Sequence, residues 1–174
     1  MGAAHAAAHP RAHPKPLVFE TFYEALNKVP NTNKGKMIVD GLKLQPTLSN
    51  PKLALTVFMP EDKYFDALSR KLNVNPNSMG KNVGLMKQVL FYHFVTGSGG
   101  ERKLFTTKDL KPGMKLDSMK PYQLAVSENK GKIQIRSVGT SAYIIKPNIR
   151  AGAGVAHIIN NVLIPMTINQ IPRF

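Results

Sequence analysis

The stretch TVFMPEDKYFDAL, residues 56–68, contains the transition that decides the fold. It overlaps the run LALTVFMP, whose apolar and β-branched residues lie between two prolines. A short apolar run bounded in this way is typical of a buried strand. Pro60 then suits the first turn of a helix, because its φ is already fixed and an amide hydrogen there would have no partner. Glu61 and Asp62 follow where the helix dipole favours anions, so the stretch predicts a buried strand that leads directly into a helix.

Two helices are expected before that strand. In LVFETFYEALNKV, residues 17–29, apolar side chains recur at three- and four-residue spacings, which is the period of an amphipathic helix, and Pro30 ends it. Residues 37–45, MIVDGLKLQ, also place apolar residues on one helical side before Pro46. Residues 46–51 are expected to form a loop.

The second half of the chain is predicted to be mostly sheet. A helix is expected over residues 83–91, and from Arg102 onward the segments KLFTT, KLDSM, YQLAVSE and KIQIRSV alternate in polarity. Asn129-Lys130-Gly131 is a hairpin-turn signal. The last core element, VAHIINNVLIP (residues 155–165), is interrupted at Asn160 and Asn161 as a bulge or turn would be.

Composition indicates one globular domain. The chain has 174 residues, 43% of them hydrophobic and 20% charged, which is enough to bury a core without staples. We expect a flexible leader at residues 1–16, a domain at 17–168 and a tail at 169–174. The leader lacks the apolar segment of a secretory signal, and no stretch reaches the ~18 to 20 apolar residues that a membrane helix needs. The absence of cysteine removes disulfides and thiolate nucleophiles.

The chain is strongly basic. Lys and Arg number 24 against 10 acidic residues, for a formal charge of +14. Such a charge attracts nucleic acids, acidic glycans and anionic membranes, and it also keeps a protein with an apolar site in solution. The basic residues are scattered and no RNA-binding aromatic signature is present, so no specific nucleic-acid partner is expected.

No combination of residues predicts an enzyme or a metal site. His5, His9 and His13 recur every fourth residue, but the prolines between them prevent a continuous helix that would gather them. His93 and His157 lie in apolar surroundings and are expected to be core residues. Glu61, Asp62 and Asp66 are accounted for by helix-start electrostatics and a solvated face. Nucleophile-elbow and phosphate-loop motifs are absent.

Three motifs resemble the fasciclin family. TVFMPEDKYFDAL is similar to its first conserved box, Tyr92-His93 to its central pair, and AHIINNVLIP (residues 156–165) to its closing box. The resemblance implies an α+β fold, a wedge-like β-sandwich of two sheets with flanking helices, and a non-enzymatic binding protein. Within the family, the single domain, the basic charge and the long apolar passage at residues 36–55 look most like the secreted, water-soluble astaxanthin-binding proteins of green algae. That likeness implies an extracellular location at the cell wall or cell periphery, although we find no signal segment in this chain.

The resemblance implies a carotenoid, astaxanthin or a related xanthophyll, as ligand. Such a pigment is a rigid apolar rod about as long as the ~30 Å diameter of a small domain, so it requires a tunnel in which apolar burial drives binding. We expect the two early helices to form a jaw over the sheet, with Gln45 as the polar group that fixes the orientation of the pigment. The predicted lining residues are Tyr23, Leu26, Ile38, Val39, Leu42, Leu44, Gln45, Pro46, Leu53, Val57, Met59 and Ile164. The eight methionines suit an adaptable cavity.

Alternatives remain open at this point. Each of these lining residues is equally accounted for as ordinary core. A monomer, or a dimer that shares one pigment, is compatible with the ligand, and transient membrane contact would serve pigment transfer. The alternative function is an extracellular adhesion or matrix module that binds acidic polysaccharide or a surface receptor through its basic face.

Overall fold

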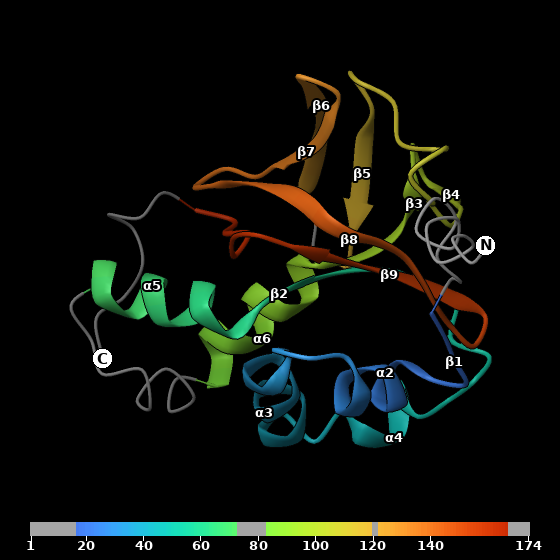
Figure 1. The fold of residues 1–174 in the computed structure, drawn as a ribbon, viewed down its shortest axis with the longest axis vertical. Helices are drawn as coiled ribbons and strands as arrows, with labels where there is room; N and C mark the ends of the chain where they lie inside the picture. Colours follow the sequence, from blue (N-terminus) through green and yellow to red (C-terminus); the bar gives the residue numbers. More distant parts are fainter. Residues whose placement is uncertain (1–16, 73–82, 120–121, 167–174) are drawn as a thin grey trace, which may run out of the picture.

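A computed structural model describes residues 17–72, 83–119 and 122–166. The predicted leader (1–16), the predicted tail (169–174) and the last residues of the predicted domain lie outside the described residues. Within them, a large sheet forms one end of the molecule and helices gather at the other (Figure 1). The α+β fold expected from the sequence is confirmed.

The sheet is continuous and closes on itself. Hydrogen bonding runs in the order β1-β8-β7-β6-β5-β3-β2-β9, β4 pairs with β3, and β9 also pairs with β8. The two sides of the expected sandwich are therefore joined through the long strand β8, which pairs with β7 near its start and with β9 further along. The strands are β1 Val18–Phe19, β2 Thr56–Pro60, β3 Phe94–Ser98, β4 Glu101–Arg102, β5 Lys115–Ser118, β6 Gln123–Asn129, β7 Lys132–Arg136, β8 Ser141–Ala151 and β9 Gly154–Ile159.

The strand-to-helix stretch forms the predicted strand and helix, but the helix begins two residues later than expected, because Pro60 is the last residue of β2 and not the first of the helix. Strand β2 is buried at every position and lies between β3, which is antiparallel to it, and β9, which is parallel. A strand covered on both faces needs a continuous apolar run, and that is what the sequence supplies. Helix α5, Asp62–Leu72, begins directly after Pro60 and Glu61.

Three expectations about the segments before β2 are wrong. Residues 17–20 are not helical, because Thr21 is the N-cap of α2 (Phe22–Lys28) and Val18 and Phe19 pair with β8 instead. The second helix, α3 (Asn33–Gly41), ends before Leu42. Residues 46–51 are not all loop, because Pro46 lies in the first turn of α4 (Gln45–Leu48), where its missing amide hydrogen costs nothing.

The back half matches its period-two pattern except in one segment. Helix α6 spans Val83–Tyr92, and the hairpin between β6 and β7 turns at Lys130 and Gly131, both with positive φ, as an Asn-Lys-Gly turn predicts. Strand β9 ends at Ile159, and a bend follows at Asn160 and Asn161. The KLFTT segment is not a strand, since its backbone is held by side chains of the sheet, as described below.

In the described part of the chain, three apolar clusters fill the interior. The first lies between α2, α3 and α4 and the sheet, the second lies within the folded sheet around Phe58 and Tyr92, and the third packs α5 and α6 against the residues after β9. We call α2, α3 and α4 the cap. These helices lie at the lower end of the molecule in Figure 1 and cover strands β2, β8 and β9.

Candidate ligand-binding site

Most of the residues predicted to line a ligand site lie together under the cap. The cap helices, the segments that flank them and strand β2 contribute them to the first apolar cluster, some fully buried and others partly so. They are Tyr23, Leu26, Ile38, Val39, Leu42, Leu44, Leu53, Val57 and Met59.

Three predicted residues lie elsewhere or serve another purpose. Ile164 is fully buried in the third cluster, beside Phe65 and Leu85, because β9 has already ended and the chain has turned toward α5 and α6. Pro46 is exposed on α4. Gln45 is also exposed, and its amide is engaged with protein groups of the cap.

A narrow apolar cavity lies at the centre of the cap interface. Its volume is about 20 Å³, which is enough for about one water molecule. Among the described residues that line it, Thr32 is the only polar one, and the others come from α2 and its C-cap, from α4 and from the strands below. They are Phe22, Ala25, Leu26, Val29, Leu48, Val57, Met59, Phe94, Ile149, Ala156 and Ile158.

Several of these lining residues were not predicted as site residues. Phe22, Ala25 and the C-cap residue Val29 follow the helical face of α2 that carries the predicted Leu26, so the three- and four-residue spacing would have identified them. The contributions of Phe94, Ile149 and Ala156 depend on the pairing order of strands far apart in the sequence, and no local pattern reveals that order.

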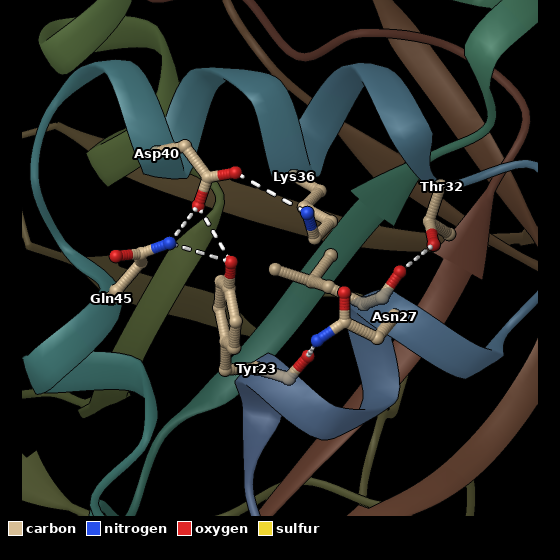
Figure 2. Close-up of polar contacts among 7 residues, drawn as sticks. Tyr23, Asn27, Thr32, Lys36, Asp40 and Gln45 are labelled. Carbon is tan, nitrogen blue, oxygen red and sulfur yellow. Dashed lines mark hydrogen bonds and ion pairs between the residues drawn. The ribbon is translucent and has the colours of Figure 1, made fainter.

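A polar cluster joins the three cap helices at their outer side (Figure 2). The Tyr23 hydroxyl donates to Asp40 Oδ1 at 2.8 Å, and the Gln45 amide donates to the same oxygen at 2.8 Å and to the Tyr23 hydroxyl at 2.7 Å. The Lys36 ammonium lies 3.4 Å from Asp40 Oδ2 and 5.6 Å from the centre of the Tyr23 ring. Partial burial tends to raise the pKa of Asp40, but the hydrogen bonds from Tyr23 and Gln45 and the charge of Lys36 outweigh it, so the pKa is lowered.

Thr32 and Asp62 complete the ends of the cap helices. The Thr32 hydroxyl is directed at the carbonyl oxygens of Leu26 and Val29, each 2.9 Å away, in the last turn of α2. Thr32 precedes α3 but makes no side-chain cap bond to it. Instead, Asp62 at the start of α5 accepts the Lys34 amide hydrogen at 2.6 Å, which supplies the missing cap from another helix.

Both ends of the cap segment are attached to the turn between β8 and β9. The Gly152 amide donates to the Phe19 carbonyl at 2.9 Å, and the Ala153 amide donates to the Pro51 carbonyl at 2.8 Å. Gly152 has a φ of 58°, and a Cβ there would lie 2.5 Å from the Pro51 carbonyl oxygen. This close approach of three segments requires glycine.

The two buried histidines, which the sequence predicts to be core residues, form hydrogen bonds to backbone groups of the protein. His93 Nδ1 lies 2.7 Å from the Val89 carbonyl oxygen, and its Nε2 accepts the Leu163 amide hydrogen at 3.0 Å. His157 Nδ1 accepts the amide hydrogen of Asn148 at 3.0 Å. Both rings are therefore neutral, with one nitrogen accepting and the other donating.

His157 also holds the segment that was expected to be a strand. Its Nε2 donates to the Phe105 carbonyl at 2.8 Å, while Thr56 Oγ1 accepts the Phe105 amide hydrogen at 2.9 Å. Phe105 is fully buried. These two side chains supply the backbone partners that a neighbouring strand would otherwise provide.

Burial sets the protonation of both rings. It lowers the pKa of His93 to about 4 despite the opposing effect of the bond to Val89. Burial also lowers the pKa of His157, opposed by the bond to Phe105.

Neither a metal cluster nor a membrane helix is found in the described part of the chain. Residues 17–72, 83–119 and 122–166 contain no group of three or more His, Cys, Asp or Glu side chains placed to hold a metal ion. None of the helices described is long and apolar enough to cross a membrane. His5, His9 and His13, which the sequence did not favour as metal ligands, lie outside the described residues.

Comparison with known proteins identifies the fold and the family. The structure is similar to a pair of FAS1 domains from the insect cell adhesion molecule Fasciclin I, with a TM-score of 0.71 and 19% sequence identity. The match covers 83% of this chain and 51% of that one, so the chain corresponds to about half of the pair. Among curated proteins no relative matches. The sequence matches the Fasciclin domain family over residues 19–165, and the chain therefore belongs to that family.

Proposed function

We propose that this fasciclin domain is a non-enzymatic carrier of an elongated apolar ligand, a carotenoid such as astaxanthin. The ligand binds between the cap and the sheet. The bound pigment protects cells under light or desiccation stress. The observation that carries the proposal is the apolar cavity under the cap, whose lining in the described part of the chain is apolar except for Thr32. Carotenoid sites need this kind of lining, because apolar burial at ~25 cal/mol per Å² supplies the binding energy.

Binding requires the cap to move away from the sheet. A cavity of about 20 Å³ is far smaller than a carotenoid, whereas sites for drug-sized ligands measure roughly 300 to 1,000 Å³. The cap helices contain 7, 9 and 4 residues, and helices this short depend on packing for their stability. The cap is attached at both ends to the β8–β9 turn, so the turn can act as the hinge while the α2–α3 connection separates from α5.

The polar cluster at the outer side of the cap suits this movement. Tyr23, Asp40 and Gln45 bind one another across α2, α3 and α4, so the three helices move as one unit. Gln45 can orient the pigment, as the sequence predicts, only if its amide exchanges the hydrogen bond to Tyr23 or Asp40 for a hydrogen bond to a terminal ring of the pigment. The pigment is bound by one chain or shared by two, and brief contact with a membrane delivers it.

The second candidate function is an extracellular adhesion or matrix module that binds acidic polysaccharide. Fasciclin domains are typically extracellular, and the similar insect structure comes from a cell adhesion molecule. A specific observation favours this candidate: the three ion pairs found in the described residues all lie on cap helices or between the cap and α5. The cations of the sheet are therefore available to an acidic partner.

The test is a visible absorption spectrum of the protein after it is mixed with astaxanthin and separated by gel filtration. We expect a coloured band that elutes with the wild-type protein and persists at high salt. Ala25→Leu fills the cavity and is expected to abolish the colour. Ala67→Leu makes the same change at an exposed position of α5 and should leave it intact.

The elution volume distinguishes one chain per pigment from two. A colourless wild-type peak would refute the carrier function. Equal colour in the Ala25→Leu and wild-type proteins would show that the pigment does not bind under the cap.

A further inference from the structure

The outward side of strands β5 to β8 is mostly polar. Residues that pair directly across strands point to the same side of a sheet, and the register runs Lys115, Ala125, Arg136 and Ser141 in one row and Ser127, Gln134 and Tyr143 in the next. Leu116, Val126 and Ile135 alternate with these residues and are buried in the core. We call this side the outer sheet face, and its members are Lys115, Asp117, Gln123, Ala125, Ser127, Asn129, Lys132, Gln134, Arg136, Ser141, Tyr143 and Ile145.

Side-chain hydrogen bonds hold the outer sheet face in place. Ser127 donates to Gln134 Oε1 at 2.9 Å, and Gln134 Nε2 donates to Ser141 at 3.2 Å, which links β6, β7 and β8. Asn129 Nδ2 donates to the Tyr143 hydroxyl at 2.9 Å, so the aromatic ring is fixed relative to the hairpin. The face is therefore ordered before any partner arrives, which lowers the entropic cost of binding.

Its charge is mostly positive. Lys115, Lys132 and Arg136 are exposed on it, and they form none of the ion pairs found in the described residues. The only carboxylate on the outer sheet face as defined, Asp117, lies at its far end and accepts hydrogen bonds from Gln123 and Gly100. The face is thus complementary to an anion.

The spacing of these cations excludes a single compact anion as the best partner. Lys115 and Arg136 lie on either side of Ala125 in the register, so they are two strand spacings apart, ~10 Å. Lys132 lies four residues from Arg136 on the same strand, or ~13 Å. One phosphate cannot contact all three, whereas an extended chain with repeated charges can.

A groove borders the face at the hairpin end. It has a volume of about 520 Å³ and is lined by Asn129, Lys130, Lys132, Tyr143, Ile144, Ile145 and Asn160. Amide side chains, an aromatic ring and ammonium groups in one groove suit a sugar acid, since a ring face packs against a pyranose, amides bond its hydroxyls and lysines pair with its carboxylates. Nucleic acid fits less well, because the described residues that line the groove include one aromatic side chain, Tyr143, and strands of bases need successive stacking platforms.

We propose that the outer sheet face and its bordering groove bind a carboxylate-bearing acidic polysaccharide. The proposal rests on the second candidate function and names its site. This site is separate from the cap, because strands β5, β6 and β7 rise at one end of the longest axis of the molecule and α2, α3 and α4 lie at the other (Figure 1).

The experiment measures binding of the full chain to polygalacturonate by isothermal titration at low and high salt, with neutral dextran as the uncharged comparison. The triple variant Lys115→Gln/Lys132→Gln/Arg136→Gln should lose about tenfold in affinity, because each exposed pair contributes up to ~1 kcal/mol and tenfold corresponds to ~1.4 kcal/mol. The matched variant Lys52→Gln/Lys63→Gln/Arg70→Gln removes the same charge from exposed positions near the helices and should lose less than about twofold. Circular dichroism verifies that each variant is folded.

A second variant tests the sugar itself. Tyr143→Ala should weaken polygalacturonate binding several-fold and leave binding of inorganic polyphosphate, which has no ring to stack, nearly unchanged. If both triple variants lose affinity equally, the binding is diffuse and the site is wrong, although the second candidate function survives. If the wild-type chain does not bind polygalacturonate at all, or binds a thymidine oligonucleotide more tightly, the function and the site both fail.

Discussion

Lowering the pH from ~7.5 to ~5 should destabilise the fold, and most directly through His93. Burial lowers the pKa of His93 from 6.5 to about 4 in the folded protein. In the unfolded chain the ring regains its ordinary pKa. At pH values between the folded and the unfolded pKa, the ring is therefore protonated in the unfolded state and neutral in the folded state. Stability is therefore complete above the unfolded pKa and falls as the pH decreases toward the folded one.

The magnitude follows from the two pKa values. Each pKa unit corresponds to about 1.4 kcal/mol, so at pH ~5, about 1.5 units below the unfolded value, His93 costs about 2 kcal/mol of the free energy of unfolding. His157 is expected to add to the loss, because its pKa is lowered in the same direction. The loss is a large fraction of the 5 to 15 kcal/mol that typical domains possess.

Urea unfolding at a series of pH values measures this effect. In His93→Gln, the side chain retains an acceptor for the Leu163 amide but does not titrate, so the variant should be less stable near neutral pH and show a shallower decline toward pH ~5. The lowered pKa of Asp40 acts mainly below this window, since its unfolded value is 3.8. A His93→Gln protein whose stability declines as steeply as the wild type would refute the assignment of the lost proton to His93.

Three substitutions in or under the cap should change the free energy of urea unfolding by predictable amounts. Gly154→Ala places a Cβ 2.4 Å from Phe22 Cζ and should cost about 1 to 3 kcal/mol by overpacking, whereas Gly41→Ala meets open space and should cost nothing. Thr32→Val leaves the end of α2 without its hydroxyl donor and should cost about 1 to 3 kcal/mol, most of which Thr32→Ser should restore. Tyr23→Phe removes a donor to Asp40 and should cost about 1 kcal/mol, while carboxyl NMR titration should show the pKa of Asp40 moving up. A neutral Gly154→Ala, a Thr32→Ser as unstable as Thr32→Val, or an unmoved Asp40 would each contradict the contact concerned.

Local chemistry made much of the fold predictable. Strand β2, helix α5 and the β6–β7 hairpin each follow from residues adjacent in sequence, such as the apolar run of residues 53–60 and the Asn-Lys-Gly turn. The errors arose where a distant partner decided the outcome. Val18 and Phe19 continue the apolar period of α2, yet they form a strand because β8 offers an edge for pairing.

The candidate site divides in the same way. The apolar residues of α2 and β2 reveal their burial through periodicity, but the role of Gln45 does not, because its partners Tyr23 and Asp40 lie on two other helices. Ile164 is predicted to lie under the cap but belongs to the third cluster, for a related reason. The polar break at Asn160 and Asn161 marks a turn, but the sequence does not show toward which helices the chain then travels.

The distribution of charge separates the two proposed binding activities. Near the cap, Lys28, Lys34 and Lys36 are neutralised by nearby carboxylates, and the cavity beneath is apolar, so salt has little to screen there. On the outer sheet face the cations have no such partners among the described residues, and screening acts fully on exposed charges at a Debye length of ~8 Å in physiological salt. Raising the salt concentration should therefore release a polysaccharide from the sheet while a pigment remains under the cap. Release of both ligands at the same salt concentration would contradict their assignment to two separate sites at opposite ends of the molecule (Figure 1).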